Sequence, residues 1–233
     1  MKFLLIGSGA SAQKVFDNKN KFRAKYDKII ISNQAIDYFE DIADYWMVME
    51  AKVDLRFKEK IYYVPKFSVK RVFNRRLLKL KHSCKLNTTD NVHLLSKVTM
   101  NKTIKNINFR KFVLAKREGL LAGPEFKRQP LGTVLAQMIH YAMIDVKPMV
   151  GASQIDIIGC ELFFPGGVEH FYKDNLYSRV KDLQKGLYKF VKTNKGMSNA
   201  YFVESAKYLR QMIQVIEKKH KVPINILCDS LIK

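Results

Sequence analysis

The chain opens with a short apolar run that leads directly into a pair of glycines. Residues 2–6 read KFLLI, and the segment GSGASA over 7–12 follows without a break. An uninterrupted apolar run of this length is typical of a strand buried on both faces, and glycines directly after it permit a tight turn into a helix. We therefore expect a strand over 2–6, a turn at Gly7 and Gly9, and a helix from Ala12 to Phe22.

The same plan recurs along the chain. We expect further strands at Ile29–Ile31, at 43–50 ending on Glu50, at 59–65, at 154–158 and near 224–226. We expect helices from Gln34, after Gly132-Thr133 and from about Asn199 to Lys221. Strands that alternate with helices indicate a parallel sheet with right-handed crossovers. The predicted fold class is therefore α/β, with a Rossmann-like, open, mostly parallel sheet.

The length of the chain and the alternation of predicted strands and helices together predict the domain organisation. A chain of 233 residues is long enough for one sizeable α/β domain. The stretch from about 66 to 116 breaks the alternation, because it is basic, poor in glycine and mixed in its apolar period. We expect a single domain over 1–233 that carries a basic inserted lobe or lid at about 66–116.

Charge is the strongest feature of the composition. The chain has 42 Lys and Arg against 21 Asp and Glu, which leaves a net charge of +21. Between Glu59 and Glu118 the only acid is Asp90. A polyanion is the partner such a charge favours, and a solvated basic face is the alternative. The predicted nucleic-acid-binding residues are Lys66, Lys70, Arg71, Arg75, Arg76, Lys79, Arg110 and Lys111.

Cellular location is predicted from what the sequence does not show. No apolar run approaches the roughly 20 residues that cross a bilayer, and the first residues do not read as a secretory signal. The three cysteines have neither metal-ligand spacing nor an even number for a closed disulfide framework. We expect no transmembrane segment and a cytoplasmic protein, in the host cytoplasm if the chain is viral.

The glycine turn is compatible with a nucleotide site. Gly7-x-Gly9-x-x-Ala12 matches the spacing that lets a backbone approach a pyrophosphate. An NAD site also needs an acid at the end of the second strand, and that place holds Asn33. Another nucleotide is therefore favoured over NAD. The alternative is structural: Gly9 permits a tight turn and Asn33 caps a helix.

Six segments in this order resemble one enzyme family: GSGASA, SNQAIDYF, ADYWMVMEA, LGTVLAQMIHYAM, IDIIGCELFF and INILCDSLIK. They are similar to segments of the bacterial sialyltransferases of glycosyltransferase family 42 and of the related motility-accessory-factor and hydroxymethylpterin-pyrophosphokinase-like domains. The resemblance covers most of the chain outside the basic middle. The positions that match the family's nucleotide-sugar site are Gly7, Ser8, Gly9, Ser11, Asn33, Gly132, Thr133, Gly159, Glu161, Phe163, Asp229 and Ser230.

The resemblance implies a single GT-A-like domain, an inverting transfer reaction and a nucleotide-sugar donor, a UDP- or CMP-sugar. No Asp-x-Asp occurs in the chain, so no metal is expected to bridge the leaving diphosphate. The charge of that leaving group would then be met by amides at Gly9 and Gly132, by the hydroxyls of Ser11 and Thr133, or by cations such as Arg128.

The catalytic base is the main departure from the family. The sialyltransferases carry a His in the region that corresponds to Lys195, and this chain has none there. His170 is the first candidate, because it lies in a glycine-rich loop beyond a strand end and an imidazole accepts a proton near neutral pH. Glu50 and Glu161, each at the carboxyl end of a strand, are the alternatives. A structural or surface role is the competing interpretation of His170.

The acceptor is predicted from charge. A nucleic acid would use the basic excess directly, and a hydroxymethylated base of viral DNA, turned out of the stack, fits such an enzyme. Two alternatives stay open: a sialyltransferase-like enzyme that acts on a surface or lipid-linked glycan, and a nucleic-acid-binding module without turnover. A pterin pyrophosphokinase would need an acidic metal cluster that the sequence does not display. The oligomeric state is not predicted.

Overall fold

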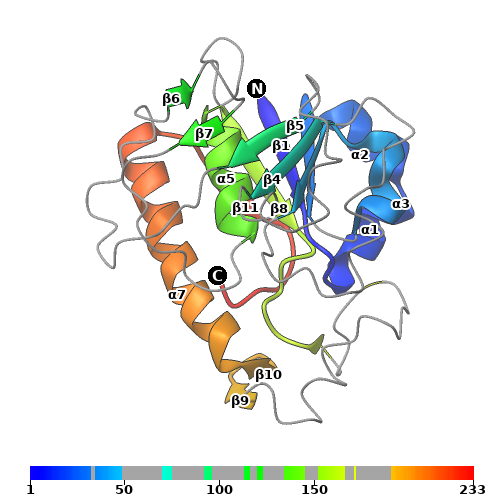
Figure 1. Cartoon of the computed structure of the whole chain (residues 1–233). Helices are drawn as coiled ribbons and strands as arrows, with labels where there is room; N and C mark the ends of the chain where they lie inside the picture. The colour runs from blue at the N-terminus through cyan, green and yellow to red at the C-terminus, as the bar shows by residue number, and fades with distance from the viewer. Residues whose placement is uncertain are drawn as a thin grey trace, which may run out of the picture.

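In the computed structural model, the strand expected at the start of the chain lies inside a large sheet (Figure 1). The structure describes residues 1–32, 35–48, 70–74, 92–95, 113–115, 120–122, 134–144, 152–165, 171 and 190–233. The strands are β1 (Lys2–Ile6), β2 (Lys28–Ser32), β3 (Tyr45–Val48), β4 (Lys70–Asn74), β5 (Val92–Leu95), β6 (Val113–Ala115), β7 (Leu120–Ala122), β8 (Gln154–Ile158), β9 (Phe190–Thr193), β10 (Gly196–Asn199) and β11 (Ile224–Ile226).

The helices are α1 (Gln13–Phe16), α2 (Lys19–Lys25), α3 (Ile36–Phe39), α5 (Val134–Ile144) and α7 (Ala200–Val215). Short 3-10 turns η1 (Ala10–Ala12) and η3 (Glu40–Ile42) precede α1 and follow α3, and a π-helical turn η10 (Ile216–His220) extends α7. The expected strands at 2–6, 29–31 and 154–158 are therefore confirmed. The expected strand at 59–65 lies outside the described residues.

The order of the strands decides where a ligand site can form. Within the described residues, nine strands make one sheet in the order β11-β8-β1-β2-β3-β4-β5-β7-β6, and all neighbours are parallel except β6 and β7. From β1 the chain builds outward through β2 and β3, and β8 then returns to the opposite side of β1. The direction of building therefore reverses between β1 and β8. The protein has an α/β fold with a mostly parallel sheet, as expected.

Helices cover both faces of the five strands β11-β8-β1-β2-β3 (Figure 1). Successive residues of β1 point to opposite faces, so Phe3 and Leu5 enter one core while Leu4 and Ile6 enter the other. The first core packs against α5 and α7, and the second packs against α1 and α3. This two-sided burial explains why β1 is an uninterrupted apolar run.

One predicted helix is divided. The segment from Ala12 to Phe22 forms the end of η1, then α1 and α2, with a break at Asp17 and Asn18. Asn18 has a non-helical backbone (φ −137°, ψ 35°), and its side-chain amide donates to the carbonyl oxygen of Lys14 at 3.1 Å. Asn competes well for such local backbone partners, which is why it interrupts a helix.

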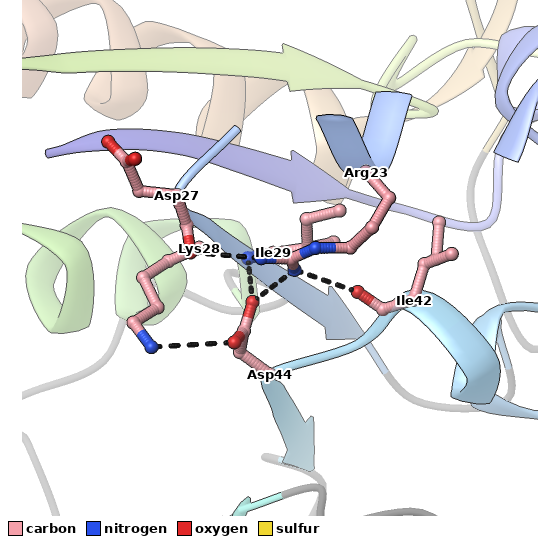
Figure 2. A network of polar contacts seen from close by, with 6 residues as sticks. All are labelled: Arg23, Asp27, Lys28, Ile29, Ile42 and Asp44. Atoms are coloured by element: carbon pink, nitrogen blue, oxygen red, sulfur yellow. Dashed lines mark hydrogen bonds and ion pairs between the residues drawn. The ribbon is translucent and has the colours of Figure 1, made fainter. Parts of the chain in front are cut away.

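An ionic network links the amino-terminal ends of β2 and β3 at one edge of the sheet (Figure 2). The Asp44 carboxylate, just before β3, accepts from the Ile29 backbone amide at 2.8 Å and from the Arg23 guanidinium at 2.5 Å. Arg23 also donates to the carbonyl oxygens of Ile42 at 3.2 Å and Asp27 at 3.1 Å. The network joins the end of α2 to the starts of β2 and β3, and it lies away from the carboxyl ends of the strands.

The predicted basic lobe contains strands of the main sheet. β4, β5 and β6 fall inside 66–116, and β4 pairs with β3 in parallel. The rest of that range lies outside the described residues. The division of the chain into a core and an inserted lobe therefore stays a prediction.

Candidate functional site

The turns that follow β1 and β8 meet at the point where the strand order reverses. Ile6 and Ile158 are register partners at the ends of the two strands. Beyond them, the Gly7 amide donates to the carbonyl oxygen of Ile158 at 2.9 Å, and the Gly9 amide donates to that of Gly159 at 2.9 Å. The two turns are therefore joined by backbone hydrogen bonds at the carboxyl edge of the sheet.

Two side chains complete this junction. The Gly159 amide donates to Ser11 Oγ at 2.9 Å, and the Ser11 amide donates to Glu161 Oε1 at 2.8 Å. Glu161 is buried, with 5% of its surface exposed. A buried carboxylate is costly unless it accepts hydrogen bonds, and the Ser11 amide supplies one. These contacts give Glu161 a positioning role in the turn, while its assignment as a catalytic group stays a prediction.

Close approach explains the glycines of this junction. A Cβ on Gly7 would lie 2.1 Å from the Gly159 carbonyl oxygen, and one on Gly9 would lie 1.7 Å from Glu161 Oε2. Gly159 has φ +71°, in the left-handed region that glycine adopts at least cost. Leu162 shares that region with φ 59°, although it has a side chain. The loop from 159 to 162 is therefore tightly constrained at both ends.

The segment after β11 wraps the same loop. Ser230 is completely buried, and its hydroxyl lies 2.7 Å from the carbonyl oxygen of Cys160, to which it donates, and 3.2 Å from that of Glu161. The Leu231 amide also donates to the Glu161 carbonyl oxygen at 2.9 Å. Ser230 therefore supports the turn after β8, and a direct contact between Ser230 and a donor stays a prediction.

Two buried cysteines lie in this junction. Burial raises the pKa of the Cys160 thiol well above its ordinary value, and the neighbouring Cys228 and Glu161 raise it further. Burial likewise raises the pKa of Cys228. Both thiols are free and are protonated at neutral pH. Because the thiolate is the nucleophilic form, these contacts favour a packing role for the pair.

An aromatic cluster adjoins the first turn. The Phe171 amide donates to the carbonyl oxygen of Ser8 at 3.1 Å. The Phe171 ring packs against Tyr38 and Phe39, with centroid separations of 5.1 and 5.3 Å, and against the partly exposed Phe16 at 6.1 Å. The cluster links the glycine turn to α1 and α3.

A β-hairpin carries a lysine to the same edge. β9 and β10 pair in an antiparallel arrangement, and Lys195 lies in the turn between them. Its ammonium group donates to the Asp229 carboxylate in the segment after β11. The hydrogen bond from Lys195 lowers the pKa of Asp229, and the charges of Lys195 and Lys233 contribute in the same direction.

The structure brings together eight of the sequence-predicted site residues near the ends of β1, β8 and β11: Gly7, Ser8, Gly9, Ser11, Gly159, Glu161, Asp229 and Ser230. The predicted residues outside the described part of the chain are Asn33, Glu50, Lys66, Arg75, Arg76, Lys79, Arg110, Lys111, Arg128, Gly132, Thr133 and His170. Lys70 and Arg71 lie in β4. All these assignments stay predictions.

One expected contact is altered by the geometry. The sequence suggested that the Gly9 amide could donate to a phosphate, but this amide already donates to the Gly159 carbonyl oxygen. The Ser11 amide is likewise used by Glu161. A phosphate at this edge would therefore bind to donors other than the Gly9 and Ser11 amides. The sequence did not indicate Lys195 or Phe171 as site residues. The available signals were the hairpin pattern around Lys195 and the glycine-rich segment before Phe171.

Neither a metal cluster nor a membrane-crossing helix occurs within the described ranges. No group of three or more His, Cys, Asp or Glu side chains there is arranged to hold a metal ion. A metal-free reaction stays a prediction. None of the helices in those ranges is long and apolar enough to cross a membrane.

Comparison of the chain with known protein families, with curated proteins and with solved structures found no match in any of the three. The resemblance to glycosyltransferase family 42 therefore rests on the short motifs of the sequence.

Proposed function

We propose that this chain is a nucleotide-sugar-dependent glycosyltransferase with a Rossmann-like, GT-A-like nucleotide-binding domain. The observation that carries the proposal is the junction of the two glycine turns between β1 and β8. In open α/β sheets, ligands bind outside the carboxyl ends of the strands where the strand order reverses. The junction of Gly7, Gly9 and Gly159 is at that point, and the family motifs fall on the same residues.

The donor we propose is a UDP- or CMP-sugar whose nucleotide lies across the ends of β1 and β8. The hydrogen bonds among Gly9, Ser11, Gly159 and Glu161 hold both turns in one arrangement before a ligand arrives. A prearranged site loses less entropy on binding than one that must first be ordered. The proposed reaction needs no metal and proceeds with inversion.

The acceptor we propose is nucleic acid, with a hydroxymethylated DNA base as the group that receives the sugar. The net charge of +21 supports this choice, because phosphate contacts supply a large part of the affinity of DNA-binding proteins. The predicted basic lobe at 66–116 would hold the backbone, and His170 would take the proton from the acceptor hydroxyl. A cytoplasmic location belongs to the same proposal.

A second candidate is a nucleic-acid-binding module that binds a nucleotide without turnover. The observation that favours it is the commitment of Glu161 to the Ser11 amide, because one of the three proposed catalytic groups is thereby used for support. Only the first candidate predicts a glycosylated product.

The test is a transfer assay with a panel of UDP- and CMP-sugars and with hydroxymethylated or unmodified DNA, in the presence of a metal chelator. Mass spectrometry of the DNA should show a sugar increment on the hydroxymethylated substrate, and His170→Asn should abolish the increment while leaving DNA binding intact. Binding of DNA and nucleotide without an increment or donor hydrolysis would favour the non-catalytic module. Transfer to a glycan and not to DNA would overturn the acceptor.

A further inference from the structure

Strand β10 of the β9–β10 hairpin is hydrogen-bonded to the loop after β8. The Phe164 amide donates to the Met197 carbonyl oxygen at 2.8 Å, and the Ser198 hydroxyl donates to that of Leu162 at 2.6 Å. Both bonds join the hairpin to the segment that directly follows Glu161. Lys195, in the hairpin turn, is therefore carried on a support that belongs to the candidate site.

Lys195 and its partner Asp229 differ in exposure. The Lys195 side chain is 23% exposed, whereas the Asp229 side chain is 65% exposed. Lys233 contributes a second positive charge near the same carboxylate. A partly buried ammonium group requires an anionic partner, and an exposed carboxylate loses little when it turns into water. Asp229 can therefore leave Lys195 at little cost, and Lys195 can then bind another anion in its place.

A cation at this edge has a role in the proposed reaction. The amides of Gly9 and Ser11 are bonded within the protein, so neither donates to a phosphate in this arrangement. A leaving nucleotide carries negative charge on its phosphate, and a Lys or Arg side chain is one of the groups that stabilise such charge. Arg23 and Lys28 cannot serve, because Asp44 holds them at the amino ends of β2 and β3.

We propose that Lys195 binds the phosphate of the donor nucleotide and that Asp229 is the carboxylate it releases when the nucleotide binds. This inference rests on the proposed function, since it names the phosphate ligand of the same site. The family motifs predict that Asp229 binds the donor, whereas in this inference Asp229 leaves Lys195 when the donor binds. Asp229 then competes with the nucleotide for Lys195.

The experiment is a calorimetric titration of UDP and of CMP into the wild-type protein and three variants. Lys195→Ala should weaken nucleotide binding about tenfold, as expected for the loss of one charge-assisted hydrogen bond. Asp229→Asn should strengthen binding about threefold, because the competing charge is removed while the side-chain shape is kept. Lys192→Ala is the matched control: it removes an exposed positive charge from β9 of the same hairpin and should leave the affinity unchanged.

Parallel titrations with uridine and cytidine separate phosphate recognition from a change of fold. Lys195→Ala should not alter the affinity for these nucleosides, because they have no phosphate. If Lys195→Ala binds UDP and CMP with the same affinity as the wild-type protein, this inference is overturned and the proposed function stands. Weaker binding by Asp229→Asn would also overturn it. Failure of the wild-type protein to bind UDP and CMP would overturn both.

Discussion

Gly9 is constrained chiefly by a single side chain. A Cβ at this position would lie 1.7 Å from Glu161 Oε2, and the nearest backbone atom, the Gly159 carbonyl oxygen, would be 2.9 Å away. At Gly7 the closest atom is the Gly159 backbone oxygen itself, at 2.1 Å. A side-chain end can move aside more readily than backbone. The two glycines should therefore respond differently when Glu161 is shortened.

We predict that Gly9→Ala lowers the free energy of unfolding by about 2 kcal/mol in the wild-type background and by clearly less in the Glu161→Ala background. Gly7→Ala is the control, and it should cost the same in both backgrounds. Urea unfolding followed by the fluorescence of Trp46, the single and buried tryptophan, measures these differences. An equal cost of Gly9→Ala in both backgrounds would contradict the contact with Glu161.

Asp156 is a buried carboxylate on the face of β8 that lies away from α5 and α7. It accepts hydrogen bonds from the Tyr26 hydroxyl at 2.5 Å, the Gln154 amide at 2.9 Å and the Asn225 amide at 2.7 Å. Burial alone would raise the pKa of Asp156, but these hydrogen bonds and the nearby Lys25 charge lower it. The network therefore stabilises the folded protein only while Asp156 is ionised.

Tyr26→Phe should lower the free energy of unfolding by about 1.5 kcal/mol at pH 7, because it removes a hydrogen bond to a charged group. The folded-state pKa of Asp156 is lowered, so this stabilisation is present above the unfolded-state pKa, about 4, and is lost as the pH falls through the folded-state value. Urea unfolding from pH 7 to pH 3 measures the difference. A cost that does not shrink in acid would show that the Tyr26 hydroxyl stabilises the protein independently of the ionisation of Asp156.

Some site residues can be predicted from their neighbours in the sequence, and others cannot. Gly7, Gly9 and Ser11 follow a buried strand, so the sequence alone predicts a turn there. The Lys195–Asp229 pair joins a hairpin to the segment after β11, 34 positions apart. Nothing near either residue in the sequence indicates that pairing, because it depends on how the hairpin docks onto the loop from 162 to 164.

Strands were the elements most readily predicted. The continuous apolar runs of β1, β2 and β8 reflect burial on both faces of a parallel sheet. The helix after the glycine turn was predicted too long, because the apolar spacing of Val15 and Phe22 continues across Asn18. The break depends on one side-chain hydrogen bond, from Asn18 to Lys14. Periodicity does not report such a bond.

The network at the amino edge offers a test of elements that lie away from the site. Asp44→Ala should lower the free energy of unfolding by about 2 kcal/mol, because the Ile29 amide and the Arg23 guanidinium lose their shared acceptor. Asp41→Ala, which removes an exposed ion pair with Lys19, should cost less than about 0.5 kcal/mol. Urea unfolding measures both.

Neither variant should change the affinity for UDP or CMP, because the network lies at the opposite edge of the sheet from the glycine turns. Weakened nucleotide binding in folded Asp44→Ala would place the ligand somewhere other than the carboxyl edge.

At the scale of the whole molecule, the proposed nucleic-acid acceptor and the net charge of +21 predict that the protein binds DNA and that this binding weakens steeply as salt rises. Replacing Lys70, Arg71, Arg75 and Arg76 by Gln should reduce the slope of log K against log salt by about 0.9 for each DNA phosphate that the protein no longer neutralises. The control replaces Lys207, Arg210, Lys218 and Lys221, which lie on α7 and just beyond it. Filter-binding titrations at several salt concentrations measure the slopes. Equal changes of slope in the two variants would indicate a diffuse charge effect instead of a basic lobe that contacts the DNA phosphates.

The central claim is that a nucleotide binds where the turns after β1 and β8 meet. A crystal structure of the protein with UDP or CMP tests it most directly. The nucleotide should lie across Gly9 and Gly159, with its phosphate on Lys195 and with the hydrogen bonds between the two turns preserved. A nucleotide bound away from the ends of β1 and β8 would contradict the claim.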